Sequence, residues 1–409
     1  MTILAVVLAD DSQRFNRGYP PKGARLFLQP NIEVMRLAAL LQPDDYLRYL
    51  DERVEPTERP ERGLCLVHVG LGQDDRAREL LHNWSGSRCT PVFFGPQVAA
   101  WREAAPAWCS PRVVGDITDI WSRLRTDAES GQLQPLYVAS GHPGYVAPRQ
   151  IKVNMEMDSG RQTTQFVRGC FCPEPVKPLC SEHLYYGNDT LMRPLDEVIG
   201  EVIALPRKRI HLLDDDVAAV PDYYTEVFSR LRDYHRQWVV NASDRLFDQP
   251  RLIRLLSKAG TRVIYLNESF LLGRLHRATG NHQLVHRLYR RVKSLQANKM
   301  LVGARLVMPV EPSMPTDYDK IASVLRQIDL DFIEPRFLRP DGSLARVVYR
   351  PMVTTTEPAW LKNRFYSMET ITDRIIRRPR RVGVFTTAVY LLPYSAAYRQ
   401  SFLEGLPWP

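Results

Sequence analysis

Short apolar segments alternate with amphipathic helical segments along most of this 409-residue chain. The first, ILAVVLAD at residues 3–10, is an apolar run that ends in acids, which is typical of a buried parallel strand. Later segments such as LCLVHV and PVFFG have the same character, and a helical pattern follows each of them. Because parallel strands need crossover connections, this alternation predicts parallel sheets built from β/α units.

The alternation divides the chain into four parts. Residues 1–125 predict a Rossmann-like, doubly wound domain of α/β class. Residues 126–160 mix polar residues with Gly and Pro, and we expect a linker there. Residues 161–340 contain six strand-like segments with intervening helices and predict a partial (β/α)6 barrel. Residues 341–409, with the segment ARVVYRP and an arginine-rich helix candidate at 369–378, predict a small C-terminal cap.

Composition is that of an ordinary globular protein, with 44% hydrophobic and 25% charged residues. The start of the chain turns acidic too soon for a secretory signal, and no window reaches the roughly 18 apolar residues of a membrane span. We therefore expect a cytoplasmic protein with no membrane span.

The formal net charge of +9 is spread along the chain apart from one dense arginine run. That run consists of Arg374, Arg377, Arg378, Arg380 and Arg381. Neither interleaved aromatic residues nor a nucleic-acid-binding module accompanies it, so we expect a solvated face rather than a nucleic-acid site.

Three of the six cysteines lie close together in the stretch VRGCFCPEPVKPLCSEH, and the other three, Cys65, Cys89 and Cys109, are scattered. This distribution does not resemble a disulfide framework, and clustered reduced thiols usually bind metal. The three thiolates of Cys170, Cys172 and Cys180 could bind three irons of a [4Fe–4S] cluster and leave the fourth iron open.

Spacing alone leaves two other interpretations open. Cys170, Cys172, Cys180 and His183 could supply three sulfurs and an imidazole to zinc. The cysteines could also be unligated loop residues. The loop follows the first strand predicted in residues 161–340. It would therefore lie at the carboxyl ends of the barrel strands, where barrel active sites are built.

Ordered phrases on both sides of the loop resemble a known family. They are VRGCFC, YYGNDTLMRPLDEVIGEV, RIHLLDDD, PDYYTEVFSRL, WVVNAS, LLSKAG and VIYLNES. In this order and spacing they resemble the radical S-adenosylmethionine (SAM) enzymes that carry an N-terminal cobalamin-binding-type domain. Phrases such as AALLQPDDYLRYLDERVEP and RVVGDITDIW extend the resemblance to the N-terminal half, so that it covers residues 1 to about 340.

The resemblance implies an enzyme with a [4Fe–4S] cluster at Cys170, Cys172 and Cys180, and with SAM bound to the open iron. It implies radical modification of a small molecule or natural-product precursor by methyl transfer, rearrangement or another bond formation at carbon. An external electron donor of flavodoxin or ferredoxin type would reduce the cluster.

Two departures from the family pattern stand out. The family's usual motif is Cys-x3-Cys-x2-Cys, whereas this chain has Cys-x-Cys-x7-Cys. Either Cys180 supplies the third thiolate of a remodelled loop, or a non-catalytic or zinc-binding scaffold has kept the fold and lost the cluster. Many members also have Asp-x-His-x-x-Gly, whose His ligates cobalt, but DERVEP stands at the corresponding place here, which leaves cobalamin an open cofactor.

The resemblance also suggests residues that face SAM or substrate. These are Asp214, Asp215, Asn241, Ser243, Glu268, Ser269 and Arg305. Arg305 could pair with a carboxylate, since guanidinium binds that group in a fork. Structural alternatives stay open, because Asp215, Asp216 and Ser269 could cap the following helices and Arg305 could belong to an ion pair. We expect His211, in an apolar strand, to be a core residue.

Overall fold

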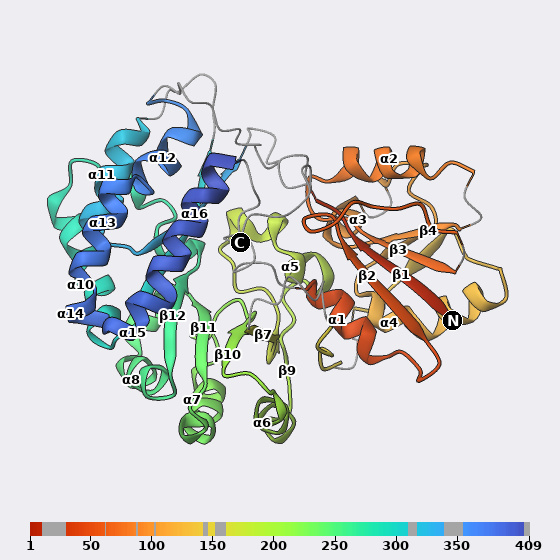
Figure 1. The fold of residues 1–409 in the computed structure, drawn as a ribbon, viewed down its shortest axis with the longest axis horizontal. Helices are drawn as coiled ribbons and strands as arrows, with labels where there is room; N and C mark the ends of the chain where they lie inside the picture. The colour runs from red at the N-terminus through yellow and green to blue at the C-terminus, as the bar shows by residue number, and fades with distance from the viewer. Residues whose placement is uncertain are drawn as a thin grey trace.

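Two six-stranded parallel sheets, each with its own helices, form the two halves of the molecule (Figure 1). The computed structural model describes residues 1–9, 30–61, 63–86, 89–101, 104–141, 146–151, 161–309, 317–338 and 355–404. The predicted α/β class, a doubly wound half followed by a partial barrel and a C-terminal cap, is confirmed.

The first sheet has the strand order β2-β1-β3-β4-β5-β6. Its strands are β1 (Thr2–Val7), β2 (Tyr46–Asp51), β3 (Leu64–His68), β4 (Pro91–Phe94), β5 (Arg112–Val114) and β6 (Leu136–Val138). Its helices are α1 (Ile32–Ala39), α2 (Asp74–Asn83), α3 (Pro96–Trp101) and α4 (Ile117–Glu129). Because crossovers are right-handed, the reversal of order at β1 places helices on both faces.

Burial along β1 follows from this double winding. Ile3 and Ala5 pack in one core with residues of α1 and α4, whereas Leu4 and Val6 pack in a second core with residues of α2 and α3. A strand whose two faces are both covered must be apolar throughout, which explains the continuous apolar run at the start of the chain.

The second sheet has the order β14-β13-β12-β11-β10-β7. Its strands are β7 (Arg161–Thr164), β10 (Arg209–Leu212), β11 (Gln237–Ala242), β12 (Thr261–Leu266), β13 (Leu301–Pro309) and β14 (Phe332–Leu338). Its helices are α6 (Leu195–Ala204), α7 (Pro221–Leu231), α8 (Pro250–Lys258), α9 (Leu275–Ala278), α10 (His282–Ala297) and α11 (Tyr318–Ile328). Each new strand is added on the same side, so the sheet follows barrel order and stays open, with β7 and β14 at its edges.

A segment that lies outside the six-stranded sheet connects β7 to α6 and contains the three clustered cysteines. It contains the antiparallel pair β8 (Val167–Arg168) and β9 (Leu191–Met192), a 3-10 helix at Glu174–Leu179, and helix α5 (Ser181–Tyr186). In Figure 1, α5 lies between the two halves of the molecule. The loop therefore stands at the junction of the two sheets.

Helices that follow β14 pack on the second sheet. They are α12 (Pro358–Phe365), α13 (Met368–Arg377), α14 (Pro379–Val382), α15 (Val384–Thr386) and α16 (Leu392–Glu404). A π-type turn, Thr387–Leu391, precedes α16, and Pro393 at its start cannot donate the hydrogen bond that a regular α-helix would require.

Three tyrosines of this segment, at a spacing of four residues, point to the same side of α16 and of the turn before it. Tyr398 contacts Tyr265 of β12 hydroxyl to hydroxyl at 2.9 Å, and both Tyr394 and Tyr398 pack on Phe332 of β14. Tyr390 donates to the Gln237 side chain at the start of β11. The segment thus runs along the strands and fills the face of the sheet that carries Tyr265.

Two details differ from the predicted boundaries. Residue 125 lies inside α4, and β6, within the predicted linker, pairs with β5 in the first sheet. Three residues are too few for their alternation to be recognised in a polar stretch. The segment ARVVYRP lies outside the described residues.

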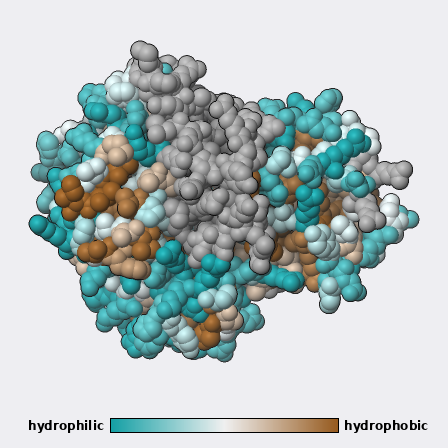
Figure 2. Space-filling model, in the orientation of Figure 1, coloured by the Kyte–Doolittle hydropathy of each residue, from teal (hydrophilic) through white to brown (hydrophobic). Residues whose placement is uncertain are grey.

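Figure 2 shows a mostly hydrophilic surface with apolar areas over the C-terminal helices. Ile376, Val384, Phe385 and Leu392 are exposed large apolar residues of these helices. Tyr390, which stands between Phe385 and Leu392 in the chain, contacts the start of β11, so these two residues lie near the amino ends of the strands. No helix in the described part of the chain has the length and apolarity to span a membrane.

Gly303 of β13 provides a stability test of the face that α16 covers. A Cβ atom there would lie 2.5 Å from Cδ1 of Tyr265, so Gly303→Ala forces the buried ring to move. We expect a loss of about 1–3 kcal/mol in the free energy of unfolding, seen as a lower thermal midpoint. Gly200→Ala, on exposed α6 with no neighbour near the added atom, should instead gain up to about 1 kcal/mol. An unchanged midpoint for Gly303→Ala would contradict this packing.

Candidate metal and cofactor site

The cysteine loop leaves β8 through a glycine that no other residue replaces easily. Gly169 has φ of +140°, and a Cβ atom on it would lie 2.8 Å from the Asp189 carbonyl oxygen. A side chain would therefore both strain the backbone and clash with it. The glycine of the Arg-Gly-Cys phrase thus has a steric cause, and it turns the chain so that Cys170 enters the loop buried.

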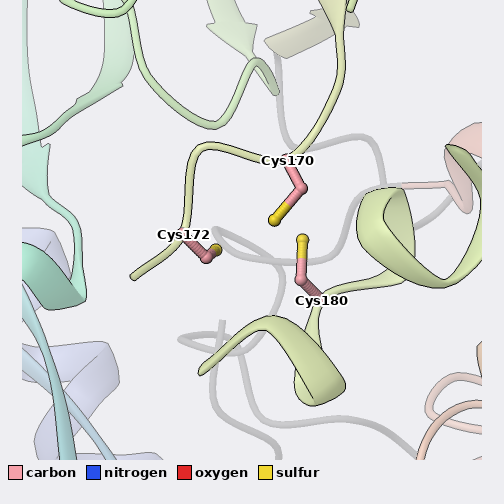
Figure 3. A group of neighbouring side chains, drawn as sticks. All are labelled: Cys170, Cys172 and Cys180. Carbon is pink, nitrogen blue, oxygen red and sulfur yellow. The ribbon is translucent and has the colours of Figure 1, made fainter. Parts of the chain in front are cut away.

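The three clustered thiols converge. The Sγ atoms of Cys170, Cys172 and Cys180 lie within 4.8 Å of one another, and Figure 3 shows their sulfur atoms pointing toward one another. Hydrogen bonds from the neighbouring thiols of Cys172 and Cys180 lower the pKa of Cys170. Hydrogen bonds among the same three thiols raise the pKa of Cys172 and of Cys180. The convergence of the three sulfurs, which bind metal in their thiolate form, is therefore the observation that favours a metal-binding site.

His183 does not join the thiols. Its Nδ1 lies 2.9 Å from the Gly187 carbonyl oxygen at the end of α5, and the only candidate ligand group in the described ranges consists of the three cysteines. Three sulfurs without an imidazole in the group fit the three-thiolate pattern of a site-differentiated [4Fe–4S] cluster better than a Cys₃His zinc site.

The buried carboxylate of Asp214 holds the backbone directly before the loop. Asp214 accepts hydrogen bonds from the amides of Phe166 and Val167 at 2.8 and 3.1 Å, and from the Tyr224 hydroxyl at 2.5 Å. Burial raises the pKa of Asp214 to about 7, although these three donors oppose the shift. Asp214 lies behind the loop and uses both of its oxygens there.

Four of the sequence-predicted residues meet at the carboxyl edge of the second sheet, beside the cysteines. Asp215 Oδ2 lies 3.3 Å from the Phe171 amide and 3.6 Å from Cys172 Sγ. Arg305 donates to Asn241 Oδ1 at 3.1 Å. The charges of Arg305 and Glu268 both act on Asp215, whose pKa burial and the nearby Cys180 raise to about 7.

The other predicted residues serve local turns. Ser243 accepts from the Arg245 amide and so caps a 3-10 turn, and its own amide donates to Asp216. Ser269 donates to Asn267 Oδ1 at 2.6 Å, and Asn267 rather than Ser269 caps the turn Glu268–Phe270. Asp216 also accepts from the Ala218 amide and so holds a local turn. The alternative that it caps the following helix is wrong, because the N-cap of α7 is Val220 and no side chain caps that helix.

Strand β14 contributes residues that the sequence reasoning missed. Glu334 accepts from Arg305 Nε at 3.2 Å and from the Tyr398 hydroxyl at 2.9 Å. Arg336 lies 3.5 Å from the buried Glu268. Glu334 and Arg336 alternate with apolar residues in FIEPRFL, so period-two spacing was the signal that could have identified them.

The carboxyl edge of the first sheet has a cavity of about 220 Å³. It is lined by Val7, Leu8, Asn31, Arg53, His68, Gly70 and Gln73. These residues stand where the strand order reverses between β1 and β3, the position at which doubly wound sheets bind ligands. In the DERVEP segment, Arg53 pairs with Asp51 at 2.5 Å, so an ion pair stands where family members have the cobalt-ligating histidine.

Buried charges join the two sheets next to the loop. Arg168, which precedes Gly169, lies 2.7 Å from Asp116 at the start of α4 and 4.3 Å from the Tyr186 ring. Tyr186 also donates to Asp116. Burial acts to raise the pKa of Asp116, but the charges of Arg36 and Arg168 outweigh it, so the pKa is lowered. The ionised Asp116 therefore holds both ends of the cysteine loop.

Substitution of single loop residues tests the ligand set. We expect Cys180→Ala to abolish incorporation of iron and sulfide, because two thiolates remain, while Cys109→Ala, at a buried cysteine of the first sheet, retains it. His183→Gln should also retain it, because the imidazole faces Gly187. Iron and sulfide analysis after anaerobic reconstitution measures the outcome. Normal incorporation in Cys180→Ala, or its loss in His183→Gln, would contradict the assignment.

The chain was compared with protein families and with known proteins of similar sequence. No protein-family model matches the chain. Over 176 residues it is 22% identical to the bacteriochlorophyllide d C-12(1)-methyltransferase of Chlorobaculum tepidum. This match covers 40% of the chain, which spans only 38% of that relative's length.

Solved structures match a larger share of this chain than the sequence relative does. The radical SAM methyltransferase TsrM from Kitasatospora setae, with cobalamin and a [4Fe–4S] cluster bound, superposes with a TM-score of 0.52 at 13% identity, over 82% of this chain and 72% of that one. The cobalamin-dependent SAM radical enzyme OxsB with aqua-cobalamin bound gives 0.50 at 12% identity, over 91% and 56%. The chain therefore has the fold of the cobalamin-dependent radical SAM enzymes, as the order of its sequence phrases predicted.

Proposed function

We propose that this chain is a radical SAM enzyme that transfers a methyl group to a small molecule, with a [4Fe–4S] cluster on Cys170, Cys172 and Cys180. The observation that carries the proposal is the convergence of these three thiols beside the carboxyl edge of an open β/α sheet, with His183 turned away. The methyltransferases among its relatives support methyl transfer over rearrangement.

The cluster would supply the electron that cleaves a carbon–sulfur bond of SAM, and a corrinoid would carry a methyl group. The chain's own residues would bind and orient. Asp215 and Glu268 suit the cationic groups of SAM, and the Arg305 guanidinium suits a carboxylate. Because Asn241 and Glu334 hold that guanidinium, it is already oriented before any ligand arrives.

Exclusion of water is the second requirement of radical chemistry, and the C-terminal helix supports it. Tyr398 and Tyr394 are almost fully buried against the sheet, and Tyr398 donates to Glu334. This wall closes the sheet face beneath Arg305. A reactive carbon radical formed at the carboxyl edge would thus meet ordered aromatic side chains rather than solvent on that side.

A corrinoid is best accommodated at the first sheet. The cavity at the β1/β3 reversal supports this placement, as do the cobalamin-bound structures of TsrM and OxsB that share the fold. The ion pair of Arg53 with Asp51 occupies the place of the family's ligating histidine. We therefore propose that the corrinoid binds without a histidine ligand from that position.

Anaerobic reconstitution with iron and sulfide, followed by incubation with reductant, SAM and hydroxocobalamin, whose reduced form can accept the methyl group, tests the function. We expect about four irons per chain and reductant-dependent consumption of SAM. Methyl transfer predicts S-adenosylhomocysteine among the products. The protein with Cys172→Ala is the matched inactive form, and Cys109→Ala the matched active one.

Two results would contradict the proposal. Zinc alone at about one ion per chain, with no iron retained and no SAM consumed, would identify a zinc-binding scaffold that kept the fold. A full cluster with 5′-deoxyadenosine and methionine as the only SAM products would retain the radical SAM enzyme but exclude methyl transfer.

A further inference from the structure

Helix α1 forms part of the wall of the first-sheet cavity. Asn31, which caps α1, lines the cavity together with His68. The Asn31 side-chain nitrogen lies 3.2 Å from His68 Nε2, and Glu33 Oε1 lies 3.2 Å from the same nitrogen. A ligand that contacts Asn31 or His68 therefore acts on the first turn of α1.

Tyr185 connects this turn to the cysteine loop. It belongs to α5, the helix that begins directly after Cys180. Its hydroxyl donates to Glu33 Oε1 at 2.9 Å and Oε2 at 3.0 Å, and both side chains are buried. Burial, and next the charge of Glu33, raise the pKa of Tyr185, so its hydroxyl stays protonated and remains a donor.

A second contact from the same helix reaches the other side of the loop. Arg36 lies one turn after Glu33, and its Nη1 donates to Gln165 Oε1 at 3.0 Å. Gln165 precedes β8 and the first cysteine. Helix α1 thus contacts the chain before Cys170 and after Cys180, and any shift of its first turn is transmitted to both ends of the loop.

We propose that Glu33 and Tyr185 are positioning residues that couple the cavity of the first sheet to the cysteine loop, so that a corrinoid and the cluster bind cooperatively. This inference rests on the proposed function, because it requires both groups to bind. Water has no access to replace the buried Tyr185–Glu33 hydrogen bonds, so a loop ordered by the cluster fixes Glu33, and through it His68 and Asn31. The coupling is reciprocal, as binding linkage requires.

Titration of the full chain with hydroxocobalamin, followed by visible absorption, tests the coupling with and without the reconstituted cluster. The variants are Tyr185→Phe, which removes one hydroxyl and keeps the ring, and Glu33→Gln, which keeps the shape and removes the charge. Tyr223→Phe is the matched control. Its hydroxyl donates to the Arg193 carbonyl within the second half of the molecule and has no part in the connection.

We expect the cluster to lower the Kd for hydroxocobalamin at least about fivefold in the native chain and in Tyr223→Phe, and to leave it unchanged in Tyr185→Phe and Glu33→Gln. A second readout needs no cluster. Hydroxocobalamin should slow hydrogen–deuterium exchange over residues 170–186 in the native chain and in Tyr223→Phe, but not in Tyr185→Phe.

Equal Kd values with and without the cluster in a native chain that binds both groups would overturn the coupling and leave the proposed function standing. Coupling that survives in both Tyr185→Phe and Glu33→Gln would overturn the role of these residues. A native chain that retains neither a cluster nor hydroxocobalamin would overturn the proposed function, and the coupling with it.

Discussion

The placement of the cysteine loop depends on Asp214. This buried carboxylate accepts two backbone amides at the start of the loop and the Tyr224 hydroxyl. It stands at the end of β10, the neighbour of β7 in the second sheet. The bonds from Asp214 therefore fix the backbone from which the cysteine loop begins.

The junction of the two sheets adds the second constraint. Arg168 is 1% exposed and pairs with Asp116 of the first half, and Tyr186 donates to the same carboxylate. Separation of the two halves would break this buried ion pair and the hydrogen bond of Tyr186. The loop that carries the cysteines is therefore built by both halves, and neither sheet alone would present it in the same form.

The fold was largely predictable, because apolar strands and amphipathic helices have distinct periods, and β1 and α6 can be recognised from residue types alone. Strand β6 was missed, since three residues in a polar stretch carry too little periodicity. The site was predictable only in part. Asp215, Asn241, Glu268 and Arg305 meet as the family phrases suggested, and their ligands remain proposals.

The residues of the site that could not be predicted from the sequence depend on contacts between segments that are far apart in the chain. Glu334 acquires its role from Tyr398, which is 64 residues away on a helix of unforeseen position. Glu33 and Tyr185 are 152 residues apart, and no local pattern links them. Ser269 was a reasonable candidate cap, but it lies inside the turn Glu268–Phe270, and Asn267, which directly precedes the turn with an extended backbone, takes that role.

The proposed chemistry requires that three thiolates hold a [4Fe–4S] cluster whose fourth iron binds SAM. Mössbauer spectroscopy of protein reconstituted with ⁵⁷Fe tests it most directly. We predict a four-iron cluster in which about one quarter of the iron signal changes when SAM is added. A spectrum that SAM leaves unchanged, or iron that is not in a four-iron cluster, would contradict it.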